Sequence, residues 1–318
     1  MIISSQGEAC SPNDDIRALD LHGTNALRDR LLQIQVSSSS GVEALLAGAE
    51  IELEQEKQAR QASVEQEKLA KIEEARQALQ DFRDYLAQSS GVAADALPSE
   101  EELEYSFNYE TQECEITHLD GHYIPLNLSR SNLQGELPLP PQLMVSELNC
   151  SDNQITALPE LPASLTALYC WSNQLTALPE LPDSLTLLTC SSNQLTALPE
   201  LTASLTELYC SENQLTALTE LTASLTKLDC RGNQLTALPE LPDNLNNLYC
   251  SDNQLTTLPE LPASLTVLEC YNNQLTNLPV LPDSLTKLYC DENPSLANDP
   301  ATQAALQAMR DRGGNVKS

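Results

Sequence analysis

Leucine and cysteine recur along the C-terminal half of the chain with a strict period of twenty residues. Each unit carries the pattern L-x-x-L-x-C-x-x-N, as in the stretch from Leu165 to Asn173, and the next unit begins at Leu185. Alternation of Leu168 and Cys170 with aromatic residues is the period of a short strand whose leucine and cysteine face inward. A fixed period of this length predicts a stacked array in which neighbouring repeats bury one continuous core. The cysteines of this column are Cys150, Cys170, Cys190, Cys210, Cys230, Cys250, Cys270 and Cys290.

The segment that returns from one strand to the next reads L-P-E-L-P-x-S and is too short for a helix. Its paired prolines fix φ and favour an extended polyproline-like run. Stacked strands pair in parallel, so we predict a repeat solenoid with a parallel β-sheet on its concave face and extended returns on its convex face. The asparagine that ends each pattern is expected to hydrogen-bond the backbone of adjacent turns, because unpaired polar groups are costly inside a core.

The repeated pattern resembles the leucine-rich repeat over residues 126–293, with cysteine in place of the usual third leucine. An irregular opening repeat has Ser131 where asparagine is expected. The return phrase is similar to the bacterial repeats of the YopM and IpaH/SspH effector families. IpaH-type ligases carry their catalytic cysteine in a further C-terminal domain, and we expect that domain to be lacking, since about 25 residues follow Asn293. The phrase L-P-x-L-P-x-S-L occurs at 158–165, 178–185, 258–265 and 278–285.

Composition divides the chain into five predicted parts. They are a weakly structured segment with a short helix near 25–35 (1–41), a charged α-helical region (42–90), an N-terminal cap (91–125), the leucine-rich repeats (126–293), and a C-terminal capping helix with a tail (294–318).

In the charged helical region, apolar residues advance by three and four positions, which is a usable coiled-coil seam. Two interpretations stay open: this seam packs against the neighbouring cap or the preceding short helix, or the region 42–88 self-associates. The seam residues are Ile72, Ala75, Leu79, Phe82 and Leu86.

The C-terminal cap is predicted as a helix from Asp299 to Arg312. Asp299 suits the N-cap, Pro300 the first turn and Gly313 the end. We expect the helix to seal the last repeat with one face, because the open end of an array exposes its core. That face is predicted to contain Ala301, Ala305, Ala308 and Met309.

The chain is strongly acidic, with 46 acidic and 16 basic residues and a formal net charge of −30. A field of this sign repels phosphate backbones and anionic lipid, so nucleic acid and membrane surfaces are poor partners. No stretch approaches the roughly 18 apolar residues of a membrane span, and the start lacks a classical secretory signal. Eight of the ten cysteines occupy one packing column, which favours a reducing compartment. We therefore expect the bacterial cytoplasm before export, with secretion into a host cell as the effector hypothesis.

Candidate chemistry is sparse. Cys114, His118 and His122 are spaced by four residues, but a structural zinc needs four ligands and the Asp-Gly between the histidines favours a hairpin turn. Cys290 precedes Asp291 and Glu292, yet it is the eighth cysteine of the inward column. There is no phosphate loop, nucleophile elbow or H-E-x-x-H motif. We predict no catalytic, cofactor-binding or metal site.

The outward strand positions vary from repeat to repeat and combine aromatic with charged residues. Aromatic anchors within a polar surround are typical of protein-binding surfaces, although tyrosine also suits an exposed strand. The predicted partner-binding residues on the concave face are Tyr169, Trp171, Glu207, Tyr209, Glu212, Asp229, Arg231, Tyr249, Asp252, Glu269, Tyr271 and Tyr289.

Three functions fit these observations. The first is a non-enzymatic scaffold that binds a protein partner, basic or from a host cell, as a secreted bacterial effector involved in virulence. The second is a substrate adaptor for a ubiquitin-type ligase whose catalytic part is absent or supplied in trans. The third is a bacterial housekeeping scaffold.

Overall fold

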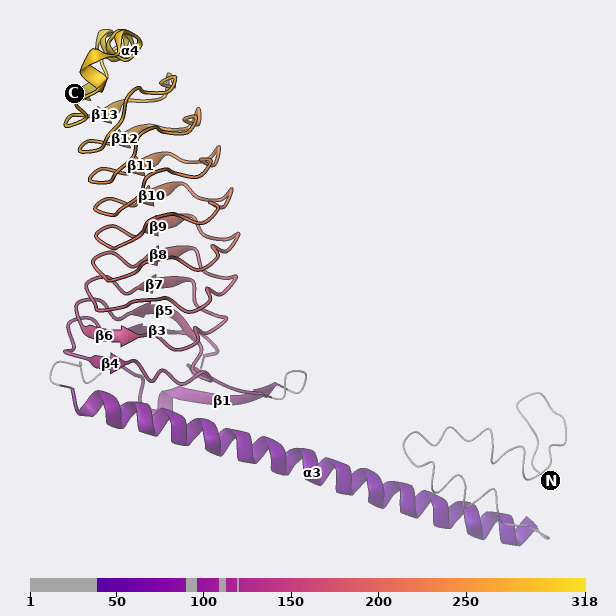
Figure 1. Ribbon diagram of the computed structural model, residues 1–318. Helices are drawn as coiled ribbons and strands as arrows, with labels where there is room; N and C mark the ends of the chain where they lie inside the picture. Colours follow the sequence, from indigo (N-terminus) through magenta and orange to yellow (C-terminus); the bar gives the residue numbers. More distant parts are fainter. Residues whose placement is uncertain (1–38, 90–95, 109–112, 119) are drawn as a thin grey trace, which may run out of the picture. The chain divides into compact units, whose positions relative to one another are not determined.

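The structure, shown in Figure 1 as a computed structural model, describes residues 39–89, 96–108, 113–118 and 120–318. The chain divides into two units, Met1–Ala70 and Lys71–Ser318, and helix α3 (Ser39–Ala87) crosses the boundary between them. The short helix predicted near 25–35 and most of the segment predicted over 1–41 lie outside the described residues. The second unit contains the whole repeat array.

One parallel sheet runs the length of this array, and the chain moves along it by one strand per repeat (Figure 1). Pairing joins residues twenty apart, as Leu188 with Leu208 and Leu208 with Leu228. The return segments of the repeats contain no helix. The predicted solenoid is therefore confirmed, with about eight turns between two helices. Its strands are β3 (Ile124–Asn127), β5 (Val145–Asn149), β7 (Ala167–Tyr169), β8 (Leu187–Thr189), β9 (Glu207–Tyr209), β10 (Lys227–Asp229), β11 (Asn247–Tyr249), β12 (Val267–Glu269), β13 (Lys287–Tyr289) and β14 (Asn315–Lys317).

The core consists of aliphatic columns and one column of thiols. In the repeat that begins at Leu165, the side chains of Leu165, Leu168, Cys170 and Leu175 are completely buried. All eight cysteines of the column are free thiols with an exposed fraction of 2% or less. The prediction that they face inward is confirmed, and they pack as small hydrophobic groups.

Asparagine side chains tie each repeat to the one before it. Asn233 Nδ2 donates to the carbonyl oxygens of Cys210 and Cys230, both at 3.1 Å, and Oδ1 accepts from the N–H of Leu215 at 3.0 Å. The same arrangement recurs in neighbouring repeats, for example at Asn213 and Asn253. The predicted role of asparagine is confirmed.

Threonines at the second position of the pattern form another ladder. Thr206 Oγ1 donates to the carbonyl oxygen of Thr186 at 2.9 Å, and Thr226 Oγ1 donates to that of Thr206 at 3.0 Å. Both ladders connect successive repeats through backbone groups, which fixes the spacing of the strands between them.

The N-terminal end of the array is covered by an antiparallel hairpin and by the last turns of α3. The hairpin comprises β1 (Leu103–Asn108) and β2 (Glu113–His118), preceded by the short 3-10 helix η1 (Glu100–Glu102). Its Ile116 bridges to Leu143 of the array. The seam residues Ala75, Leu79, Phe82 and Leu86 are buried in the same core as Ile116, and Ile72 packs against it. Of the two interpretations, packing against the cap is the one found, so this seam is not free for self-association.

A second, smaller parallel pair joins the irregular opening repeat to the next repeat: β4 (Gln134–Glu136) pairs with β6 (Gln154–Ala157). Ser131 replaces asparagine there and is only 2% exposed. Its N–H donates instead to Oδ1 of Asn153 at 3.1 Å. The first asparagine of the ladder thus serves the opening repeat as well.

The C-terminal end is closed by η2 (Leu296–Asn298) and by helix α4 (Pro300–Asp311). The predicted N-cap is confirmed, because Asp299 accepts a hydrogen bond from the N–H of Thr302 at 2.8 Å. The predicted apolar face was partly wrong. Met309 is buried, but Thr302 and Leu306 are buried with it, while Ala301 and Ala308 are exposed. Thr302 faces the last repeats, because its hydroxyl accepts a hydrogen bond from the N–H of Leu278 at 3.1 Å.

Candidate protein-binding face

The outward side chains of the strands form one continuous surface, which we call the sheet face. It comprises the third, fifth, seventh and eighth positions of the L-x-x-L-x-C-x-x-N pattern in the repeats from 145 to 292. Strand register places the fifth positions in one row, in which Tyr209 and Tyr249 flank Asp229, and Glu269 lies beside Tyr289. All twelve residues predicted to bind a partner lie on this surface.

Exposure differs among those twelve residues. Trp171 is 37% exposed and Glu212 is exposed, whereas Asp229 is only 5% exposed. The remaining nine are half-buried. A partner would therefore meet most of these side chains at their tips, but it would not reach the carboxylate of Asp229.

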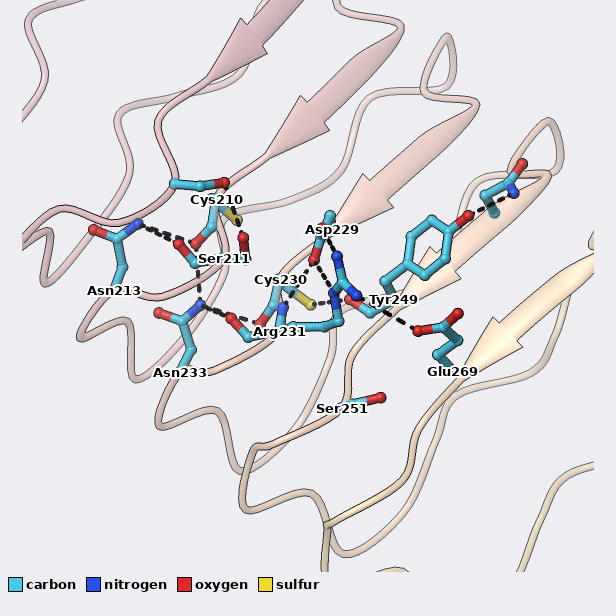
Figure 2. A network of polar contacts seen from close by, with 12 residues as sticks. Cys210, Ser211, Asn213, Asp229, Cys230, Arg231, Asn233, Tyr249, Ser251 and Glu269 are labelled. Carbon is cyan, nitrogen blue, oxygen red and sulfur yellow. Dashed lines mark hydrogen bonds and ion pairs between the residues drawn. The ribbon is translucent and has the colours of Figure 1, made fainter. Parts of the chain in front are cut away.

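Arg231 occupies the centre of an ionic network on the sheet face (Figure 2). Its Nε and Nη2 donate to the two carboxylate oxygens of Asp229 at 2.9 and 2.7 Å, and Nη1 lies 3.6 Å from Glu269 Oε2. The guanidinium carbon lies 5.2 Å from the ring centroid of Tyr249, which is a cation–π contact. The hydrogen bonds to Asp229 raise the pKa of Arg231 despite partial burial. This bidentate pairing gives both oxygens of the buried Asp229 carboxylate a charged hydrogen-bond donor.

A second pair lies one strand away. Lys227 Nζ donates to Glu207 Oε1 at 2.8 Å, and the hydroxyl of Tyr209 donates to Glu207 Oε2 at 2.8 Å. Burial opposes ionisation of Glu207, but these two hydrogen bonds outweigh it and lower its pKa. Burial and the adjacent carboxylate raise the pKa of Tyr209. Both carboxylate oxygens of Glu207 thus already accept a hydrogen bond from a side chain of the sheet face.

The C-terminal end of the sheet face contains a pair that sequence reasoning missed. Lys317 of β14 places Nζ 2.9 Å from Asp291 Oδ2, and this hydrogen bond raises the pKa of Lys317. Asn315 of the same strand donates to the hydroxyl of Tyr289 at 3.1 Å. The sequence carries no repeat signal in the tail that would place β14 beside β13.

The repeats that begin at Leu165 and Leu185 differ from the rest, because their outward positions carry no charge. We call these side chains the uncharged patch. Sequence reasoning selected Tyr169 and Trp171 among them and missed the others, which alignment of the outward columns would have found. The patch comprises Ala167, Tyr169, Trp171, Ser172, Leu187, Thr189, Ser191 and Ser192.

Residues at the eighth position adopt the left-handed conformation, with φ from 49° at Asn272 to 61° at Gly232. A Cβ on Gly232 would lie 2.5 Å from Glu212 Oε1. We therefore expect Gly232→Ala to lower the free energy of unfolding by about 1–2 kcal/mol, because it adds backbone strain and displaces Glu212. Urea unfolding followed by circular dichroism measures this. Ser192→Ala is the matched control, because that position already carries a side chain at φ 54°. Equal effects of the two substitutions would contradict the prediction.

The residues considered for metal binding or catalysis do not converge. Cys114 is buried, His122 is exposed, and His118 Nδ1 contacts Asp120 Oδ1 at 3.0 Å. Among the described residues, no three side chains of His, Cys, Asp or Glu are arranged to hold a metal ion. Burial raises the pKa of the Cys290 thiol to about 11. A nucleophilic cysteine needs the opposite shift.

Fold and repeats together define the class. The chain belongs to the leucine-rich-repeat proteins, and its repeats are of the bacterial type with a cysteine column. Within the described part of the chain, no helix combines the length and apolar character needed to cross a membrane.

Solved structures resemble the repeat array. YopM from Yersinia enterocolitica is 38% identical, with a TM-score of 0.43, over 54% of this chain and 44% of that one. A Shigella effector leucine-rich-repeat domain is 33% identical (TM-score 0.43), over 58% of this chain and 76% of that one. The functional domain of InlJ from Listeria monocytogenes, described as including a cysteine ladder, is 30% identical (TM-score 0.45), over 57% of this chain and 47% of that one. The chain thus spans less than half of the YopM and InlJ chains. No protein-family model and no curated protein matches.

Proposed function

We propose that this chain is a non-enzymatic scaffold that binds another protein through its sheet face. The observation that carries the proposal is the row of half-buried tyrosines held at fixed spacing on a parallel sheet. Tyrosine and tryptophan are enriched at the energetic centres of protein interfaces. The asparagine and threonine ladders hold these side chains in place before a partner arrives, which lowers the entropic cost of binding.

The state of the thiols supports a role without catalysis. Burial raises the pKa of Cys150 and Cys190 to about 12, so these thiols stay protonated and inaccessible at neutral pH. Asp291, next to the least buried member of the column, is already paired with Lys317.

The proposal extends to an effector that is exported by a bacterium and acts inside a host cell. Its support is the likeness of the return phrase to bacterial effector repeats and the 38% identity to YopM. A translocation reporter fused to the chain tests export: a signal in host cells supports it, and retention in the bacterium contradicts it.

Binding is tested by replacing Trp171, Tyr209 and Tyr249 with alanine together. We expect at least a tenfold loss of the partner recovered by affinity capture from host lysate, because interface aromatics carry most of the binding energy. Tyr123→Ala is the control, since Tyr123 is an exposed aromatic residue outside the sheet face. Circular dichroism verifies that both variants fold. Equal recovery by the wild type and the triple variant would remove the sheet face from the proposal.

A further inference from the structure

We infer that the uncharged patch is the main contact site of the sheet face, and that its partner presents apolar side chains flanked by lysine or arginine. This inference rests on the proposed function and names the chemistry of the partner. The observations that carry it are the distribution of charge over the repeats and the pairing of those charges within the chain.

We call the four outward positions of one repeat a rung. Only two adjacent rungs, those of the repeats that begin at Leu165 and Leu185, carry no charge. The rung before the patch carries Glu147 and Asp152, and each rung after it, from Glu207 to Glu292, carries at least one acidic or basic side chain. Between them, β7 and β8 pair Ala167 with Leu187 and Tyr169 with Thr189. The patch is therefore a continuous uncharged area with charged residues on both sides.

Most charges beyond the patch already have partners on the sheet face. Glu207 is paired with Lys227, and Arg231 binds Asp229 and Glu269. A protein that docks there must desolvate these pairs or compete with them, and such contacts add little net affinity. Docking on the uncharged patch carries no such penalty. The energetic centre of binding is therefore expected on the patch.

The side chains of the patch suit contact with apolar groups. Trp171 is one of the exposed large hydrophobic residues of the chain, and Leu187 is half-buried. Thr189 is smaller than its two row neighbours, Tyr169 and Tyr209, and its buried hydroxyl has no hydrogen-bond partner among the described residues. Large aromatic residues beside a small one give the relief into which an apolar side chain fits.

The charges at the border of the patch determine the flanking residues of the partner. Glu147 pairs in register with Ala167, and Glu212 follows Ser192 by one repeat. Both carboxylates are exposed, and neither has a hydrogen-bond or ion-pair partner among the described residues. They remain available to lysine or arginine of a partner, whose approach the net charge of −30 also favours. A second copy of this chain would instead bring like charges together.

The chain contains a single tryptophan, Trp171, so intrinsic fluorescence reports directly on the patch. We would select peptides from a displayed random twelve-residue library on the full-length chain and titrate synthetic copies of the winners by tryptophan fluorescence. The expected sequences combine aromatic or aliphatic residues with lysine or arginine. Their affinity is expected to fall severalfold on Glu147→Gln together with Glu212→Gln, and to fall with salt.

A matched pair of double variants locates the site. Tyr169→Ala with Leu187→Ser removes the centre of the patch and keeps the reporter. Tyr289→Ala with Val267→Ser makes the same kinds of change in the same two rows on charged rungs. We expect at least a tenfold loss of affinity for the first variant and less than a threefold loss for the second.

Three other results would contradict, in turn, the partner chemistry, the location of the site or binding through the sheet face. Selected peptides rich in acid or free of apolar residues contradict the partner chemistry. A larger loss in the second variant than in the first places binding on the charged rungs, so the inference fails while the proposed function stands. Peptides indifferent to both variants, or no enrichment over a blank surface, contradict binding through the sheet face altogether.

Discussion

The repeat array is expected to unfold when the pH is raised from 8 to 10 in reducing buffer, without any denaturant. Burial raises the pKa of all eight ladder thiols: to about 12 for Cys150 and Cys190, to about 11 for Cys290, and above the ordinary value for the others. Unfolding returns these thiols to water, where their pKa is about 8.5. The native state therefore keeps protons that the unfolded state loses.

The sign of the effect follows from proton linkage. Below pH 8 both states are protonated, so the full stability is present, and it is lost as the pH rises through the pKa of the unfolded thiols. At pH 10, each thiol that stays protonated in the native state lowers the free energy of unfolding by about 2 kcal/mol relative to its value at neutral pH. Eight thiols together amount to about 16 kcal/mol, which exceeds the typical stability of 5–15 kcal/mol. The cysteine column thus stabilises the folded array at neutral pH and destabilises it at alkaline pH.

Urea unfolding at half-unit steps of pH, followed by circular dichroism, measures this loss. A variant with Cys190→Ala and Cys210→Ala is the control, because it removes two of the eight titrating groups. Its stability should fall by about one quarter less between pH 8 and 10 than that of the wild type. A urea midpoint that is constant up to pH 10 would mean that the thiols are accessible to water in the native state.

Most of the array could be predicted from the sequence, because the same physical requirement repeats every twenty residues. Each repeat must bury the same leucines and thiol and must satisfy the same backbone groups, so the columns of cysteine and asparagine specify both the fold and its inward face. The N-cap of α4 could also be predicted, because Asp299 and Thr302 are close in sequence.

Features that depend on pairing between distant segments could not be predicted. β14 joins the sheet because Asn315–Lys317 lies beside β13 once α4 has turned the chain back, and its three residues carry no pattern of their own. The burial of Thr302 depends on the backbone of Leu278, 24 residues away. On the sheet face, the sequence showed which residues are charged, but the pairing of Arg231 with Asp229 and Glu269 required side-chain geometry. The binding role of these residues stays a prediction.

Replacing Asn233 by alanine is expected to lower the free energy of unfolding by about 3–5 kcal/mol. The variant loses the donor to Cys210 O and Cys230 O and the acceptor for Leu215 N–H. The two carbonyls keep bonds from Asn213 and Asn253, but the buried N–H of Leu215 is left unpaired, which costs about 1–3 kcal/mol by itself. Each lost bond adds about 1 kcal/mol.

Two further variants separate this effect from loss of packing. Asn244→Ala removes one exposed bond, from Nδ2 to Ala223 O at 3.0 Å, and should cost less than about 1 kcal/mol. Asn233→Asp keeps the acceptor for Leu215 N–H but sets carboxylate oxygens against the carbonyls of Cys210 and Cys230. We therefore expect it to be more destabilising than Asn233→Ala at neutral pH and to recover as the pH falls and the buried carboxyl gains a proton, since a protonated group donates again. If Asn233→Asp proved as stable as the wild type at pH 7, the donors of the ladder would not be what holds the repeats together.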